Sequence, residues 1–238
     1  LGATSAVLML VFKDTITGLA AGVRLTSNDM LHKGDWITVK SVDANGIVED
    51  MSLTTVKVRN FDNTIVTISP ITLVNGSFQN WIGMQKSGRR VKRVVYFDFR
   101  SVRLVDETLK RNLLAKHFAT EDSFKLKESL QKAIDKDIQE GKDIEDLKNP
   151  AALAPTNLQL YRKFMEKYLR QRPEVNTDLT LMVRHMEATQ CGLPIEFYFF
   201  IKDKVWVNYE HILADIMEHA YALANEFGLK IYEQYPEQ

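Results

Sequence analysis

The pattern of hydrophobic and polar positions sets the first thirty residues apart from the rest of the chain. Residues 1–12 form a charge-free, mostly apolar run, and a second run of smaller residues, 15–23, follows the charged pair Lys13 and Asp14. A run of this length is shorter than the roughly 20 apolar residues that span a bilayer. Because the first residue is not Met, we expect a fragment whose apolar run continues upstream. The pattern alone leaves a buried helix and part of a transmembrane helix equally open.

Residues 31–85 carry short stretches of β-branched residues separated by turn residues, which is typical of strands. The pair Asn45-Gly46 favours a tight hairpin. Pro70 ends the last stretch, because proline cannot donate a hydrogen bond to a sheet. The pattern favours a small β-barrel or SH3-like sheet. The predicted strands are 36–40, 46–51, 53–59 and 64–69.

The polar, basic segment 86–90 is predicted to separate this β domain from a second domain. The order of elements there is strand, helices, strand, strand, helix, strand, which is that of a ferredoxin-like α/β domain. Residues 118–156 would be a helical insertion in its first crossover. Either Asp106 or Ser101 is predicted to cap the first helix, and Asn157 a later one, and Gly228 is predicted to end the last helix. The predicted strands are 91–99, 179–186, 194–201 and 229–232, and the predicted helices begin near 106, 123, 158 and 208.

Charge is balanced over the whole chain but not locally. The formal net charge is zero, so no overall field recruits nucleic acid or acidic lipid. Segment 86–116 has ten Lys or Arg against three Asp or Glu, whereas 203–237 has seven acids against two bases. These segments indicate either complementary surfaces or separate solvated faces. The single cysteine, Cys191, excludes a disulfide within one chain and is interpreted as a small apolar residue.

No pattern in the sequence indicates catalysis. His211 and His219 share a predicted helix, but they are eight residues apart, and no metalloprotease, nucleophile-elbow or phosphate-loop motif is present. We therefore predict no enzyme activity, no catalytic residue, no metal site and no cofactor. The alternative function is a soluble ring-forming or RNA-binding module of Sm-like plus ferredoxin-like domains. Against it, the predicted strand 91–99 lacks the glycine–aromatic pattern of an RNA-binding strand.

Several short motifs, at their spacing along the chain, resemble the small-conductance mechanosensitive channel family. They are Leu19-Ala-Ala-Gly-Val23, Gly34-Asp-Trp-Ile37, Gly46-Ile-Val48, Leu53-Thr-Thr55 and Asn80-Trp81. Three further segments and the insertion 118–156 resemble the bacterial miniconductance branch of that family. These segments are Gln79–Met84, Thr180–Arg184 and Gly192–Glu196. The resemblance covers nearly the whole chain.

The resemblance implies a homoheptameric channel in the bacterial inner membrane, with its body in the cytoplasm. Membrane tension during hypo-osmotic stress would open the pore and release ions and small solutes. The implied partners are the lipid bilayer, further copies of the chain and the permeant ions and solutes, with no nucleic acid. The implied domains are a pore-lining transmembrane helix at 1–30 (kinked near 13–18), the Sm/SH3-like β domain at 31–85 and the ferredoxin-like domain at 86–238.

The resemblance also implies roles within the pore helix. It assigns the pore constriction to Leu10 and Ala6, close packing between helices to Gly2 and Ser5, and the kink to Lys13, Asp14 and Gly18. The charged pair Lys13 and Asp14 replaces small polar residues that the family has at the kink. Residues around Leu10 are also bulkier than the family pattern. We therefore expect a pore that is narrower, or harder to open, than is usual for the family.

Overall fold

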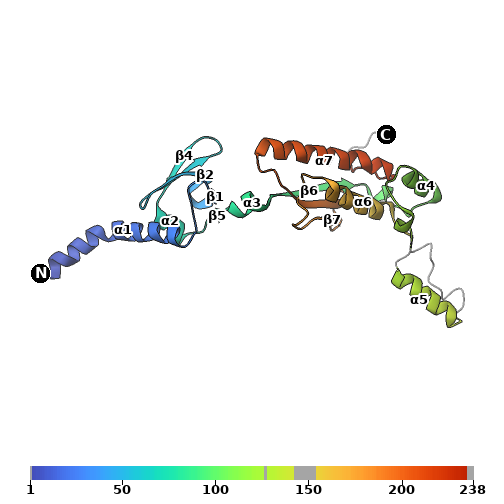
Figure 1. Cartoon of the computed structure of the whole chain (residues 1–238), viewed down its shortest axis with the longest axis horizontal. Helices are drawn as coiled ribbons and strands as arrows, with labels where there is room; N and C mark the ends of the chain where they lie inside the picture. Colours follow the sequence, from blue (N-terminus) through green and yellow to red (C-terminus); the bar gives the residue numbers. More distant parts are fainter. Residues whose placement is uncertain (1, 126–127, 142–153, 235–238) are drawn as a thin grey trace. The chain divides into compact units, whose positions relative to one another are not determined.

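The computed structural model describes residues 2–125, 128–141 and 154–234 (Figure 1). The chain divides into two compact units, Leu1–Ser87 and Gly88–Gln238. The division lies within the polar, basic segment 86–90. Each unit has its own hydrophobic core, as expected of separate domains.

The first unit begins with α1 (Gly2–Ser27), a helix without interruption. Lys13 and Asp14 are both exposed, so their charges remain in water and do not break the helix. The Thr17 hydroxyl donates to the Lys13 carbonyl at 2.7 Å. Such back-bonding bends helices without ending them. The helix therefore continues through the predicted kink at 13–18, so a kink there would be a bend in a continuous helix.

Five antiparallel strands follow α1 and form one sheet in the order β4-β3-β2-β1-β5. Apolar residues at alternate strand positions, such as Ile37, Val39 and Val58, are buried with Leu25 of α1 and Leu73 of α2. The elements after α1 are β1 (Trp36–Val39), η1 (Lys40–Val42), β2 (Ala44–Met51), β3 (Val56–Asn60), β4 (Ile65–Ile68), α2 (Pro70–Asn75), β5 (Gln79–Asn80) and α3 (Ile82–Ser87).

The predicted hairpin between the first two strands is confirmed, since β1 and β2 pair as antiparallel neighbours, but its turn is not at Asn45-Gly46, because both residues lie inside β2. The chain turns earlier, at η1, where Asp43 takes the left-handed conformation with φ of 52°. Gly46 is needed for another reason: a Cβ there would lie 1.9 Å from the Arg59 carbonyl oxygen on the neighbouring strand. The glycine therefore allows two strands to approach closely, which a local turn signal does not reveal.

The second unit contains an antiparallel sheet in the order β6-β8-β7. On the free side of β6, Ile231 forms a single bridge to Phe97. One face of the sheet packs against α6 and α7, with Phe197, Phe199 and Phe227 in a shared core. The elements are β6 (Arg89–Phe97), η2 (Phe99–Ser101), α4 (Glu107–Ala115), η3 (Glu121–Ser123), α5 (Glu128–Gln139), α6 (Asn157–Gln171), β7 (Met182–His185), β8 (Leu193–Ile201) and α7 (Trp206–Glu226).

Two of the three predicted helix ends in this unit are confirmed. The Asp106 side chain accepts from the Leu109 amide and caps α4, and Gly228 follows α7 with φ of 66°. The predicted cap at Asn157 is wrong, since Thr156 caps α6 by accepting from the Gln159 amide. Asn157 is instead fully buried by contacts from distant parts of the unit. Of the predicted insertion 118–156, residues 126–127 and 142–153 lie outside the described residues.

Candidate functional site

Apolar side chains of α1 are exposed along much of its length. Leu10 is 74% exposed, and Val11, Phe12 and Ile16 are each more than half exposed. A folded protein rarely leaves so many neighbouring apolar side chains in water, so this surface marks a contact with lipid or with other chains. Within the described residues, none of the helices is both long and apolar enough to cross a membrane.

The residues predicted to form the pore all lie on α1. Leu10 follows Ala6 by one helical turn, so the two residues share a side of the helix. For Gly2, Ser5 and Ala6, the described part of the structure gives the helical backbone alone. A Cβ added at Gly18 would meet nothing within 4 Å. Their roles in constriction, packing and kinking stay predictions.

The last third of α1 is docked onto the β sheet. Ala21 and Leu25 are buried, and Leu25 belongs to the core of the first unit. A Cβ at Gly22 would lie 2.4 Å from the Leu53 carbonyl oxygen, in the turn between β2 and β3. Only glycine permits this approach between helix and turn. The end of α1 is therefore held by side-chain burial and by a close backbone contact.

A buried carboxylate holds the segment just after α1. Asp35 is 6% exposed, and its carboxylate accepts from the His32 amide at 3.0 Å and from the Asn80 side chain at 2.8 Å. The same Asn80 amide nitrogen donates to the Met30 carbonyl at 3.2 Å. One side chain of β5 thus joins the exit of α1 to the turn before β1. Sequence reasoning listed Asp35 and Asn80 in separate motifs and missed that they meet.

The tryptophans of the same two motifs also meet. Trp36 and Trp81 stack with ring centroids 5.1 Å apart, and Phe61 packs edge-on against Trp36 at 5.0 Å. The Trp81 ring nitrogen donates to the Thr38 hydroxyl. Because Trp81 directly follows β5, these contacts hold β5 against β1 and keep Asn80 within reach of Asp35.

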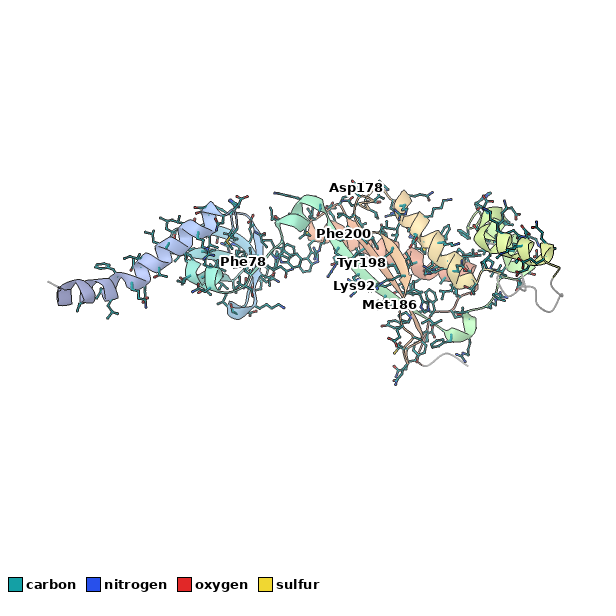
Figure 2. The ribbon with its side chains drawn as sticks, turned by 90° about the horizontal axis from the view of Figure 1, so that it is seen from below. Phe78, Lys92, Asp178, Met186, Tyr198 and Phe200 are labelled. Carbon is teal, nitrogen blue, oxygen red and sulfur yellow. The ribbon has the colours of Figure 1, made fainter. Side chains whose placement is uncertain are left out.

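In the second unit, the last residues of two other motifs form an ion pair. Arg184 of β7 donates to the Glu196 carboxylate of β8 at 2.5 Å, and the Lys92 ammonium of β6 lies 3.7 Å from the other carboxylate oxygen. Glu196 is fully buried, and the hydrogen bond from Arg184 lowers its pKa. Tyr198, Phe200 and Lys92 share this face of the sheet, opposite α6 and α7 (Figure 2).

An ion pair joins the basic segment 86–116 to the acidic segment 203–237 within the second unit. Lys116, in the basic segment, contacts Glu226, in the acidic segment, at 2.5 Å. Cys191 is exposed in the turn between β7 and β8, so it does not serve as a buried apolar residue. Among the residues that the structure describes, no three His, Cys, Asp or Glu side chains gather closely enough to hold a metal ion.

Comparison with known proteins identifies the first unit. Residues 14–83 match the family described as mechanosensitive ion channel, beta-domain. The small-conductance mechanosensitive channel MscMJ of Methanocaldococcus jannaschii is 32% identical over 80 residues, which are 34% of this chain and 22% of that protein. An uncharacterized MscS family protein of Helicobacter pylori is 30% identical over 101 residues, 42% of this chain and 16% of that protein. The chain thus spans a small part of these curated relatives.

Solved structures extend the similarity of fold to both units. The closed-state crystal structure of Helicobacter pylori MscS aligns with a TM-score of 0.58 and 14% identity, covering 100% of this chain and 70% of that one. Arabidopsis thaliana MSL1 aligns with a TM-score of 0.58 and 11% identity, covering 98% of this chain and 64% of that one. At such identities the similarity concerns the fold alone. Residues 14–83 are thus a mechanosensitive ion channel β domain, similar in sequence to proteins of the small-conductance mechanosensitive channel family, and the mixed α+β architecture of the chain matches the fold of MscS structures.

Proposed function

We propose that the full-length protein is an ion channel that membrane tension opens during hypo-osmotic stress. One observation carries the proposal: α1 exposes apolar side chains at one end and is docked at the other onto a mechanosensitive-channel β domain. The exposed part suits lipid or neighbouring copies of α1. The docked part couples movement of that helix to the body of the protein. Ions and small solutes then leave down their gradients, without a chemical step.

The proposed assembly is a homoheptamer in the bacterial inner membrane, of the miniconductance branch, with the body in the cytoplasm. Its support is the resemblance of the motifs and the match of residues 14–83 to the mechanosensitive ion channel β domain. The order β6-β8-β7 with Ile231 beside β6 supports a ferredoxin-like second domain, whose short fourth strand is the bridge to Phe97. The insertion at 118–156 would then separate the first strand of that domain from its second.

In this assembly, copies of α1 surround the pore. Leu10 and Ala6 form rings that narrow it, and apolar rings of this kind favour loss of water from the pore. Gly2 and Ser5 let neighbouring helices pack closely. Lys13, Asp14 and Gly18 mark the bend of each helix. Tension favours the state with the larger area in the membrane plane, and only such a difference between states lets a stimulus shift their equilibrium.

Patch-clamp recording tests the proposal. The full-length protein is expressed in bacterial spheroplasts that lack their other tension-gated channels, and the tension that opens half of the channels is measured. Leu10→Ser should lower this tension, because a polar ring keeps water in the constriction. Val11→Ser is the matched control, since Val11 is similarly exposed but points about 100° away around the helix. An absence of current near the lytic tension in wild type and variants would contradict the proposal, as would extraction of the protein without detergent.

A further inference from the structure

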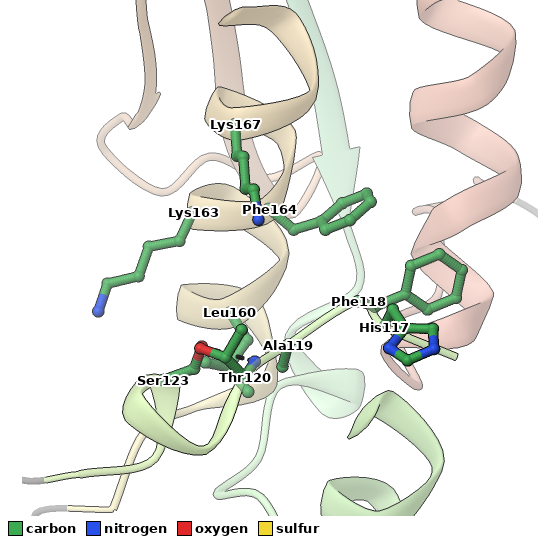
Figure 3. A pocket seen from close by; sticks show the side chains of 9 residues that line it. All are labelled: His117, Phe118, Ala119, Thr120, Ser123, Leu160, Lys163, Phe164 and Lys167. Carbon is green, nitrogen blue, oxygen red and sulfur yellow. Dashed lines mark hydrogen bonds between the residues drawn. The ribbon is translucent and has the colours of Figure 1, made fainter. Parts of the chain in front are cut away.

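A small cavity lies in the second unit, between α6 and the segment 117–123 that follows α4 (Figure 3). Its volume is about 150 Å³. Pockets for drug-sized ligands usually measure about 300–1,000 Å³, so this cavity suits a smaller compound. The family match ends at residue 83, so the cavity lies in a part of the chain to which that match assigns no role.

The apolar part of the cavity is rigid. The rings of Phe118 and Phe164 lie 5.2 Å apart at 79°, and both contact the fully buried ring of Phe227. Leu160, on the preceding turn of α6, is also part of the lining. Because these side chains belong to or pack against the core, the apolar surface is already formed before anything binds.

Two positive charges border this apolar surface. Lys163 and Lys167 lie one turn apart on α6 and are both exposed. Among the described residues, neither lysine forms an ion pair. Like charges at this spacing repel each other. A negatively charged ligand between them would remove that repulsion.

Glu121 and Asp122, which lie between the lining residues Thr120 and Ser123 in sequence, are paired elsewhere. Glu121 lies 3.9 Å from Lys110, and Asp122 lies 2.7 Å from Lys125. The hydrogen bond from Lys125 lowers the pKa of Asp122, which therefore keeps its negative charge and its partner. None of these four residues lines the cavity. These two acidic residues therefore do not neutralise Lys163 and Lys167 of the lining.

Two hydroxyl groups complete the polar side of the cavity. The oxygens of Thr120 and Ser123 lie 3.2 Å apart, and the Ser123 oxygen also accepts from the Thr120 amide at 3.1 Å. One hydroxyl proton can join the two oxygens, which leaves the second proton to donate to a ligand. Lysine and hydroxyl donors together are suited to a carboxylate or phosphate oxygen.

We propose that this cavity binds a small organic anion, with one carboxylate or phosphate group and a short aromatic or aliphatic body. The anionic group lies between Lys163, Lys167 and the two hydroxyls. The body rests on Phe118 and Phe164. This binding is separate from the passage of ions through a pore, and it does not depend on the channel proposal.

Isothermal titration calorimetry of the full-length protein in detergent tests this site, with phenyl phosphate as the probe. Inorganic phosphate lacks the aromatic body, and phenol lacks the charge, so each measures one half of the proposed ligand. We expect saturable binding of phenyl phosphate that is weakened about tenfold by Lys163→Gln with Lys167→Gln. Arg170→Gln, an exposed change one turn further along α6, is the matched control and should leave the affinity unchanged.

The thermal unfolding midpoint of each variant is measured in parallel, and exposed lysines should be replaceable without a change in it. Absence of saturable phenyl phosphate binding, or equal binding to the double variant, would overturn the proposal. If phenol bound as tightly as phenyl phosphate, the cavity would recognise only the aromatic body and not the anionic group, which would also overturn the proposal. Equal affinity for inorganic phosphate would overturn the role given to Phe118 and Phe164.

Discussion

The Asn80 side chain donates a 2.8 Å hydrogen bond to the buried carboxylate of Asp35 and, from the same nitrogen, a 3.2 Å bond to the Met30 carbonyl. These two bonds connect Asn80 to two neighbouring positions, Met30 and Asp35, which lie 50 and 45 residues earlier in the sequence. They hold the exit of α1 against the turn before β1 and against β5. If α1 moves relative to the β domain, the bond between Asn80 and the Met30 carbonyl must move with the helix or break.

Asn80→Ala should lower the free energy of unfolding by about 1–3 kcal/mol, because it leaves the buried Asp35 carboxylate short of a donor. The measurement is urea denaturation of the full-length protein in detergent, followed by tryptophan fluorescence. Gln79→Ala, an exposed change on the same strand, is the control and should alter stability by less than about 0.5 kcal/mol. A similar loss in both variants would show that Asp35 does not depend on this bond.

Gly22 and Gly18 form a matched pair on α1, because only one of them faces another backbone. Gly22→Ala places a Cβ 2.4 Å from the Leu53 carbonyl oxygen, whereas a Cβ at Gly18 meets nothing within 4 Å. We expect Gly22→Ala to destabilise the first unit by about 1–3 kcal/mol through overpacking. Gly18→Ala should stabilise α1 by up to about 1 kcal/mol, since alanine is the better helix former.

Thermal unfolding of both glycine variants in the same detergent measures these opposite shifts. An equal response of the two variants would mean that α1 does not dock against the turn at Leu53.

The ion pair of Arg184 and Glu196 should make stability depend on pH. The hydrogen bond from Arg184 lowers the pKa of Glu196 below its ordinary value of 4.5, although burial opposes the shift. A lowered folded-state pKa means that the unfolded chain takes up the proton first. The stabilisation is therefore complete above about pH 4.5 and is lost as the pH falls through the lower folded value.

Urea midpoints measured between about pH 7 and about pH 3 test this dependence. Arg184→Met should lower the urea midpoint at neutral pH. It should also make the midpoint decrease less as the pH falls, because the main cause of the lowered Glu196 pKa is removed. Lys92→Met should lower the urea midpoint at neutral pH by a smaller amount, since the Lys92 nitrogen lies 3.7 Å from the Glu196 carboxylate oxygen and is the weaker partner. An acid response of Arg184→Met as steep as that of wild type would contradict this account.

The elements with local signals were predictable from sequence. β-branched stretches gave the strands before Pro70, and a carboxylate at Asp106 and a glycine at Gly228 marked two helix ends. Such features act within a few residues of themselves, so their pattern is complete in the sequence. The motif spacing likewise indicated the channel family, which the β-domain match supports.

Tertiary structure decided the rest, because it depends on partners distant in sequence. Asn157 has the side chain of a helix cap, yet it is buried with its amide bonded to the carbonyls of Ser101 and Phe227. Gly46 looks like a turn residue, yet it serves the close approach of two strands. No pattern within a few residues predicts that Asp35 pairs with Asn80. By itself the sequence indicated most strands and helices and the family of the β domain, but not α2, α3 or β5. Folding decided which polar groups meet, since a buried group must find its partner in space and not along the chain.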